Sequence, residues 1–95
     1  MAVEFDPAKD AANLAKHGVS LARAADMDIA AVVEDDRFDY GERRYRAFGE
    51  IDGAWHCLAF AVRGSVVRAI SLRRAHQREI RRHVHQEHLR QEHPR

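Results

Sequence analysis

Helical periodicity marks the start of this 95-residue chain. In "FDPAKDAANLAKHG", residues 5–18, alanines recur at intervals of three and four residues, a spacing typical of one helix face. Asp6 is a favoured N-cap residue, Pro7 suits the first helical position, and Gly18 suits a C-terminal cap. The small side chains on this face would let the predicted helix lie close to a sheet.

A second short helix is predicted over "VSLARAADMD", residues 19–28, with Ser20 as its N-cap residue. Leu21 and Ala24 fall on the side that we expect to be buried. Residues 3–5 are a candidate for a short lead-in strand before the first helix. The N-terminal part of the chain is therefore expected to hold two helices.

The pattern changes to one typical of strands after this point. The four candidate strands are "IAAVVEDD" (29–36), "RRYRAFG" (43–49), "WHCLAFAVR" (55–63) and "VVRAISLR" (66–73). The dipeptides Asp52-Gly53 and Gly64-Ser65 favour two-residue hairpin turns. The last three strands should form an antiparallel meander, which the first strand is expected to extend.

Alternation of side chains assigns the two faces of this predicted sheet. Leu58 and its alternate neighbours form a bulky apolar face that is suited to packing against helices. The opposite face carries small residues such as Ala59 and Ser71, and it ends in arginines. Strict alternation places Arg68 on the other face from Ser71. A shallow face with a floor of Ala and Ser and a rim of Arg can admit a polar ligand, although a helix or a partner can also cover it.

The chain is expected to be helical again from Ala75 onward, with Ile80 and Val84 among its few apolar contacts. The expected fold is therefore α+β, with two N-terminal helices, a four-stranded antiparallel sheet and a C-terminal helix. We expect a single domain spanning residues 1–95. The extension from about residue 84 to residue 95 is predicted to be helical and then to fray.

Charge is distributed unevenly along the chain, although the net charge is only +1. Residues 1–62 contain seven Lys and Arg against twelve Asp and Glu, whereas residues 63–95 contain nine Arg against three Glu. Arginine forms two-point contacts with phosphate oxygens, so this asymmetry favours a nucleic-acid ligand. A solvated helix face would give the same composition.

The sequence lacks the motifs that are typical of several classes of function. The chain contains no P-loop, dinucleotide-binding fingerprint or serine-hydrolase motif, so we expect no cofactor. Its single cysteine rules out an internal disulfide and fits a reducing compartment. We find no apolar run long enough for a membrane span and no signal peptide, so no membrane contact and a cytoplasmic location are expected.

Seven histidines are many for a chain of this length. His85 and His88 are three residues apart on the predicted tail helix and could share a metal ion. No H-E-x-x-H or C-x-x-C motif accompanies them, so we predict no native metal site. A single histidine can still act as an acid or base near neutral pH.

Arg63, Arg68, Arg73 and Arg74 cluster on the last two predicted strands and at the junction with the tail. A sheet face with such side chains can bind single-stranded RNA. The 2′-hydroxyl of RNA can attack the neighbouring phosphate if a base takes its proton and fixed cations stabilise the developing charge. Arginines with a histidine or a carboxylate therefore suffice for RNA cleavage.

Three segments resemble the BrnT toxins, which are the ribonuclease half of a type II toxin–antitoxin pair. They are "DPAKDAANLAKHGVS", "YGERRYRAFG" and "GSVVRAISLRRAHQREIRR", and the resemblance covers roughly residues 4–83. It implies a RelE-like fold and metal-independent RNA cleavage that inhibits translation. It also implies a BrnA-like antitoxin with a ribbon-helix-helix part, through which alone operator DNA would be contacted.

Candidate site residues follow from this resemblance together with the arginine cluster. The predicted catalytic residues are His17, Arg68, Arg73 and His83. The predicted RNA-binding residues are Lys16, Arg43, Arg63 and Arg74. His83 stands where a tyrosine is common in the family, and two interpretations follow: the histidine takes over proton transfer, or the activity is lower than in the family.

Each of these roles has a structural alternative. His17 can stabilise the C-terminal end of a helix, Arg68 can pair with a carboxylate from the first two strands, and Glu79 can pair with Arg82 or cap a helix. The alternative function is a non-catalytic module that binds an antitoxin-like partner within a DNA-binding repressor complex.

Overall fold

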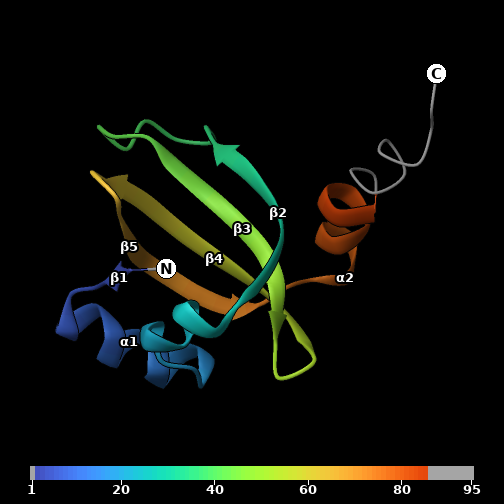
Figure 1. The fold of residues 1–95 in the computed structure, drawn as a ribbon, viewed down its shortest axis with the longest axis horizontal. Helices are drawn as coiled ribbons and strands as arrows, with labels where there is room; N and C mark the ends of the chain where they lie inside the picture. Colours follow the sequence, from blue (N-terminus) through green and yellow to red (C-terminus); the bar gives the residue numbers. More distant parts are fainter. Residues whose placement is uncertain (1, 86–95) are drawn as a thin grey trace.

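The computed structural model describes residues 2–85, which form a five-stranded mixed sheet with helical segments on both faces (Figure 1). The strands are β1 (Val3–Glu4), β2 (Asp28–Asp35), β3 (Arg44–Ile51), β4 (Ala54–Arg63) and β5 (Val66–Arg74). The helical segments are α1 (Pro7–His17), the 3-10 helix η1 (Leu21–Asp26), the short α2 (Gln77–Glu79) and the π-helix η2 (Ile80–His85). The strand order is β1-β5-β4-β3-β2.

The prediction of a four-stranded antiparallel sheet was wrong, because β1 adds a fifth strand that runs parallel to β5. Val3 pairs with Val67, and the amide of Val67 donates to the carbonyl of Ala2 at 3.0 Å. A strand of two residues is too short to show any periodicity, and its partner lies more than 60 residues away. The four predicted strands themselves are confirmed to within two residues at each end.

The prediction of two N-terminal α-helices was also wrong, because the second segment is the 3-10 helix η1. Ser20 does cap it, with Oγ accepting from the amide of Ala22 at 3.1 Å. At the other end the Met27 amide donates to the Ala24 carbonyl at 3.3 Å, and Met27 already has extended backbone angles. Six residues between a fixed cap and a strand leave little room for α-helical hydrogen bonds, and 3-10 geometry is common in such short pieces.

The helix α1 has the predicted caps but not the predicted buried face. Asp6 accepts from the amide of Ala8 at 2.8 Å, and Gly18, with φ 76°, donates to the carbonyl of Leu14. The alanine face is exposed, and the buried residue of α1 is instead Asn13. Its side chain donates to the Leu72 carbonyl at 2.8 Å and accepts from the Leu72 amide at 3.1 Å. A polar residue therefore joins α1 to the edge of β5.

Both predicted hairpins are confirmed. Asp52 and Gly53 have φ values of 52° and 78° between β3 and β4, which fits a turn with positive φ at both central residues. Gly64, with φ 62°, begins the two-residue connection between β4 and β5. These tight turns fix the register of the three central strands.

Two apolar clusters lie on opposite faces of the sheet. The larger one joins Leu21 and Ala24 of η1 to Leu58, Phe60 and other buried side chains of the central strands. The smaller one comprises Phe48, Cys57, Ile80 and Val84. Ile80 and Val84 are thus buried contacts of the C-terminal segment, as predicted. His88 and the rest of the predicted extension from residue 86 lie outside the described residues.

Candidate RNA-binding site

A bulge in β5 decides which side chains share a face with the candidate site. The pairing of β5 with β4 shifts between Ser71 and Ala69, which leaves Ile70 as an extra residue. Arg68 therefore lies on the same face as Ser71 and Arg73, whereas Ala69 turns to the larger core. The strict alternation expected from the sequence therefore fails at Ile70, and the β5 residues that precede Ile70 lie on the opposite face from the one predicted.

A hollow of about 210 Å³ opens on this face, above the middle of the sheet. Ala59 and Ser71 line it, so the predicted combination of small residues and arginines is confirmed. Its charged and aromatic lining residues are Asp35, Arg37, Tyr40, Arg44, Arg46 and Arg73. Four guanidinium groups and one carboxylate line the hollow, and Glu42 and Glu79 pair with Arg44 and Arg73 from beside it, so a net positive charge remains that favours an anionic ligand.

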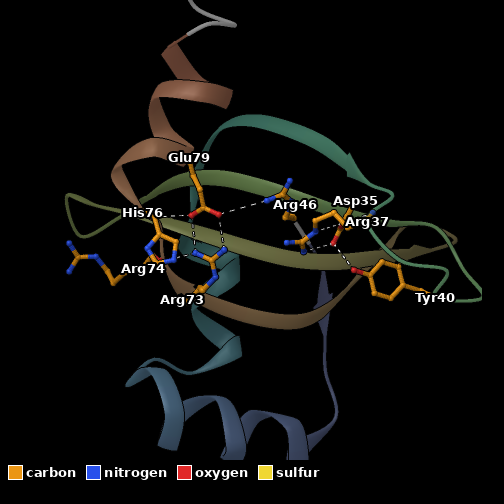
Figure 2. Close-up of polar contacts among 8 residues, drawn as sticks. All are labelled: Asp35, Arg37, Tyr40, Arg46, Arg73, Arg74, His76 and Glu79. Atoms are coloured by element: carbon orange, nitrogen blue, oxygen red, sulfur yellow. Dashed lines mark hydrogen bonds and ion pairs between the residues drawn. The ribbon is translucent and has the colours of Figure 1, made fainter.

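Arg73 is held at one end of the hollow by Glu79 of α2 (Figure 2). Its two terminal nitrogens donate to the two carboxylate oxygens at 2.9 and 2.8 Å, a bidentate pair. Glu79 also accepts from the amide of His76 at 2.8 Å. The hydrogen bonds from Arg73, with a smaller contribution from that amide, lower the pKa of Glu79 to about 2. Glu79 is therefore a fixed negative charge that orients Arg73.

Arg46 of β3 approaches the same carboxylate more loosely. Its Nη1 lies 3.7 Å from Oε2 of Glu79, beyond hydrogen-bond distance, and its guanidinium lies 5.7 Å from the centroid of the Phe48 ring. Within residues 2–85, the buried Nε of Arg46 has no hydrogen-bond partner. A buried donor without a partner is costly, so this Nε makes the position of Arg46 unfavourable for stability, and only the terminal nitrogens of its guanidinium are available to a ligand.

Asp35, at the end of β2, organises the opposite end of the hollow (Figure 2). It accepts from Arg37 Nε at 2.7 Å, from Arg37 Nη2 at 2.9 Å and from the Tyr40 hydroxyl at 3.1 Å. The contact with Arg37 lowers the pKa of this nearly buried carboxyl to about 2 and raises the pKa of Arg37. Arg44 stacks over the Tyr40 ring at 4.3 Å. Asp35 thus fixes both the charge and the aromatic ring at this end.

A second hollow, of about 450 Å³, continues the first towards the C-terminal segment. The two adjoin because Arg37 and Arg46 line both. We call them together the basic groove, whose arginines are Arg37, Arg44, Arg46, Arg73, Arg78 and Arg82. His83 also lines it, and its ring stacks on Phe48 with centroids 4.9 Å apart. Burial, and then the charges of Arg46 and Arg82, lower the pKa of His83.

Comparison with known families assigns the chain. A family model described as "Ribonuclease toxin, BrnT, of type II toxin-antitoxin system" matches residues 5–79. This chain belongs to the BrnT family. No curated protein and no solved structure matches it. Membership in a type II toxin–antitoxin family implies ribonuclease activity and a protein antitoxin as partner. The matched region includes Arg46, Arg73 and Glu79 and ends before His83.

Two of the predicted residues of this BrnT family member lie in a neighbouring hollow. His17 and Lys16 line a space of about 220 Å³ beside α1, which meets the basic groove at Ile70 and Ser71. Burial, followed by the charges of Lys16 and Arg73, lowers the pKa of His17. His17 and His83 thus line separate hollows that share no lining residue.

The structure places the remaining predicted residues outside the basic groove. Arg68 lies 3.7 Å from Glu4 of β1, and Arg63 lies 3.7 Å from Glu42. Arg43 is exposed in the β2–β3 connection. Arg74 lines a separate hollow with His17 and His56. Of the eight predicted residues, Arg73 and His83 alone line the groove as it is defined here.

Several groove residues of this BrnT family member were missed by the sequence analysis. These are Asp35, Arg37, Tyr40, Arg44 and Arg46. A signal for two of them was present, since alternation along β3 puts Arg44 and Arg46 on one face with Phe48. The positions of Asp35 and Arg37 depend on the bend at the end of β2, which no periodicity encodes.

Neither a membrane-spanning helix nor a metal cluster is found in the described part of the chain. No helix within residues 2–85 is long and apolar enough to cross a membrane. No group of three or more His, Cys, Asp or Glu side chains in the same range is arranged to hold a metal ion. His88, one of the two tail histidines considered for a metal, lies outside this range.

Proposed function

We propose that the chain is an endoribonuclease toxin that cleaves RNA in the basic groove without a metal ion and so inhibits translation. The observation that carries this proposal is the convergence of Arg46 and Arg73 on one carboxylate within a positively charged hollow. A site that holds a carboxylate between two guanidinium groups offers suitable donors to a phosphate oxygen as well.

The two arginines have different tasks in this mechanism. Arg73, fixed by Glu79, supplies a pre-oriented positive charge, and Arg46 supplies its terminal guanidinium nitrogens, of which Nη1 lies 3.7 Å from Glu79, beyond hydrogen-bond distance. As the 2′-oxygen bonds to phosphorus, negative charge grows on the non-bridging oxygens, and preorganised donors stabilise that charge. The bond from phosphorus to the 5′-oxygen then breaks, which leaves a 2′,3′-cyclic phosphate and a 5′-hydroxyl.

Proton transfer is assigned to the two histidines with lowered pKa values. His83 lines the groove beside Arg46 and is neutral at pH 7, so it is suited to accept the proton of the 2′-hydroxyl. His17 lines the adjoining hollow, which meets the groove at Ile70 and Ser71, so RNA that spans this junction would place the 5′-oxygen beside His17, the candidate for returning its proton. Glu79 is a poor acid, because its pKa of about 2 keeps it ionised.

Metal independence is tested by cleavage of a labelled RNA in the presence of EDTA. We expect the rate to persist, because the groove's own arginines supply the positive charge. Loss of cleavage on chelation, with recovery on adding Mg²⁺ or Zn²⁺, would contradict this part of the proposal.

The proposed antitoxin is a BrnA-like chain with a ribbon-helix-helix DNA-binding part. An acidic segment of that chain would cover the basic groove, which would block RNA and add electrostatic complementarity. The complex, rather than the toxin alone, would then contact operator DNA.

The decisive experiment is induction of the gene alone in a bacterial host, followed by measurement of growth and of protein synthesis. Wild type should arrest growth, and Arg46→Ala and Arg73→Ala should relieve the arrest. Arg81→Ala is the matched control, because Arg81 is exposed on η2 and lines neither part of the groove. A folded wild type that leaves growth and RNA intact would favour the non-catalytic partner-binding module instead.

A further inference from the structure

Phe38 is an unusually exposed aromatic residue in the connection between β2 and β3. Its side chain is 69% exposed, the largest value among the exposed large hydrophobic residues of the described chain. Single exposed apolar residues are common on protein surfaces, so exposure alone indicates nothing. What distinguishes Phe38 is the set of groups beside it.

Phe38 stands next to a ring that is already fixed at the groove. Its centroid lies 5.9 Å from that of Tyr40, and the two rings meet edge to face at 74°. Tyr40 is anchored by its hydroxyl to Asp35 and is covered on one side by the Arg44 guanidinium. Tyr40 also lines the hollow that contains Arg46 and Arg73. An exposed ring is therefore held at the rim of the proposed phosphate site.

We propose that Phe38, supported by Tyr40, is a stacking platform for an RNA base that flanks the phosphate bound in the basic groove. This inference rests on the proposed function and adds a substrate-binding residue to it. A base has an uncharged flat face that stacks on aromatic rings regardless of its identity, so the platform selects unpaired RNA rather than a particular sequence.

The charges around Phe38 favour a base over a phosphate at this position. Arg37, whose side chain lines the hollow, and Asp39 are its direct neighbours in the sequence, while Asp36 precedes Arg37 and Glu42 follows in the same connection. These carboxylates repel a phosphate, whereas the arginines that attract one lie further inside the hollow. The nucleotide would thus direct its phosphate inward and its base outward onto Phe38.

The test uses short fluorescent RNA that is made uncleavable by 2′-O-methyl groups, with each position in turn replaced by an abasic residue. Binding of each RNA to wild type and to Phe38→Ala is measured by fluorescence anisotropy. For wild type we expect one abasic position to weaken binding about tenfold, the typical contribution of one stacked base. Phe38→Ala should bind the intact RNA more weakly by a similar factor, and an abasic residue at that position should not weaken the binding of this variant further.

Two further variants sharpen this experiment. Phe38→Trp should retain or increase the affinity, because indole stacks at least as well as phenyl. Leu14→Ala is the control for loss of an exposed apolar side chain, since Leu14 is 50% exposed on α1, and it should leave RNA affinity unchanged.

The outcomes separate this proposal from the proposed function. If wild type binds RNA and Phe38→Ala binds it equally well, the platform is refuted while the ribonuclease assignment stands. If wild type binds none of the RNAs, both are overturned. If Phe38→Ala loses affinity only for the antitoxin encoded beside the toxin gene, Phe38 belongs to the protein interface and the base-stacking role is rejected.

Discussion

The two faces of the sheet differ in chemistry, because one is an apolar core and the other carries a charged groove. The face covered by α1 and η1 buries a continuous apolar cluster that includes Leu21, Leu58 and Leu72, each 1% exposed or less. The apolar cluster on the face covered by α2 and η2 contains only four buried residues among those described, and the basic groove lies beside it, with the residues of Figure 2 in and around it. In a chain this short, one face alone has to supply most of the apolar burial.

This difference indicates which substitutions should affect stability and which should affect activity. Burial of apolar area stabilises the fold directly, whereas forming an ion pair in a partly buried groove gives little net stability because desolvation offsets the attraction, although neutralising one partner of such a pair is destabilising. Substitutions on the α1 face should therefore act on folding. Substitutions in the groove should act on RNA and leave most of the folding free energy intact.

The largest effect is expected from Leu58→Ala on the α1 face. Removing a fully buried leucine leaves a cavity and should lower the free energy of unfolding by about 2–5 kcal/mol, measured by urea denaturation. Val32→Ala, at a position that is 52% exposed on β2, is the control and should change it by less than about 0.5 kcal/mol. Equal losses at the two positions would contradict the assignment of the main core to this face.

Arg46→Ala should have the converse effect. We expect the cleavage rate to fall about 100-fold, the usual cost of losing one preorganised donor to a developing oxyanion. The melting temperature should hardly change, because the substitution also removes a buried Nε without a partner. Arg81→Ala should leave both quantities unchanged, and a similar loss of activity in this control would indicate a diffuse charge effect.

Acid should destabilise the groove face through Asp35 and Glu79. The folded-state pKa of each is lowered to about 2 from an ordinary value of 3.8 or 4.5, so their contributions are complete above those ordinary values. Each should lose about 2 kcal/mol of stabilisation as pH falls to about 2. In Glu79→Gln the free energy of unfolding, measured by denaturation at a series of pH values, should decline less steeply below pH 4.5 than in wild type. An unchanged decline would contradict this role of Glu79.

The pH dependence of cleavage tests His83. Because burial lowers its pKa below 6.5, the neutral base should predominate at pH 7, and the rate should fall as pH drops through that lowered value. In His83→Gln the overall rate should be lower and this acidic limb should disappear from a plot of log rate against pH. If the variant keeps an acidic limb at the same pH, another group acts as the base. His17 would then be tested in the same way.

The smallest effect is expected at Arg68. It is 3.7 Å from Glu4 at the β1 end of the sheet and does not line the basic groove, so Arg68→Ala should change stability by less than about 1 kcal/mol. Its RNA cleavage rate should stay within a few-fold of wild type. A loss as large as that of Arg46→Ala would restore the catalytic role that the family resemblance implies for Arg68.

Local signals in the sequence predicted local structure well. Asp6, Pro7 and Gly18 delimit α1 as expected, and the glycine-containing turns delimit the central strands, because each feature depends on neighbouring residues. The family resemblance was confirmed as well. The failures are non-local: the candidate strand at residues 3–5 is present as β1, but its parallel pairing with β5 was not predicted, and the extra residue at Ile70 has no periodic signature.

The candidate site shows the same limit. Arg73 was predicted to belong to the site, and Glu79 does cap α2 through the amide of His76, as one alternative predicted, but the pairing of Glu79 with Arg73 was not predicted. Arg46 and Asp35 were not recognised, because their importance arises where β2, β3 and β5 come together. Spacing along one strand can indicate a shared face, but it cannot tell which charges from three strands meet.

The amide of Asn13 has a consequence for how this chain can assemble. It forms hydrogen bonds with both main-chain groups of Leu72 and donates to the carbonyl of Val19, so an α-helix completes a stretch of sheet edge that β1 is too short to reach. Another polypeptide adding to the sheet there would first have to break all three bonds. Fibril-like stacking or strand exchange through this side is thereby opposed, and β2 at the far edge is left as the more accessible place for a new strand to join.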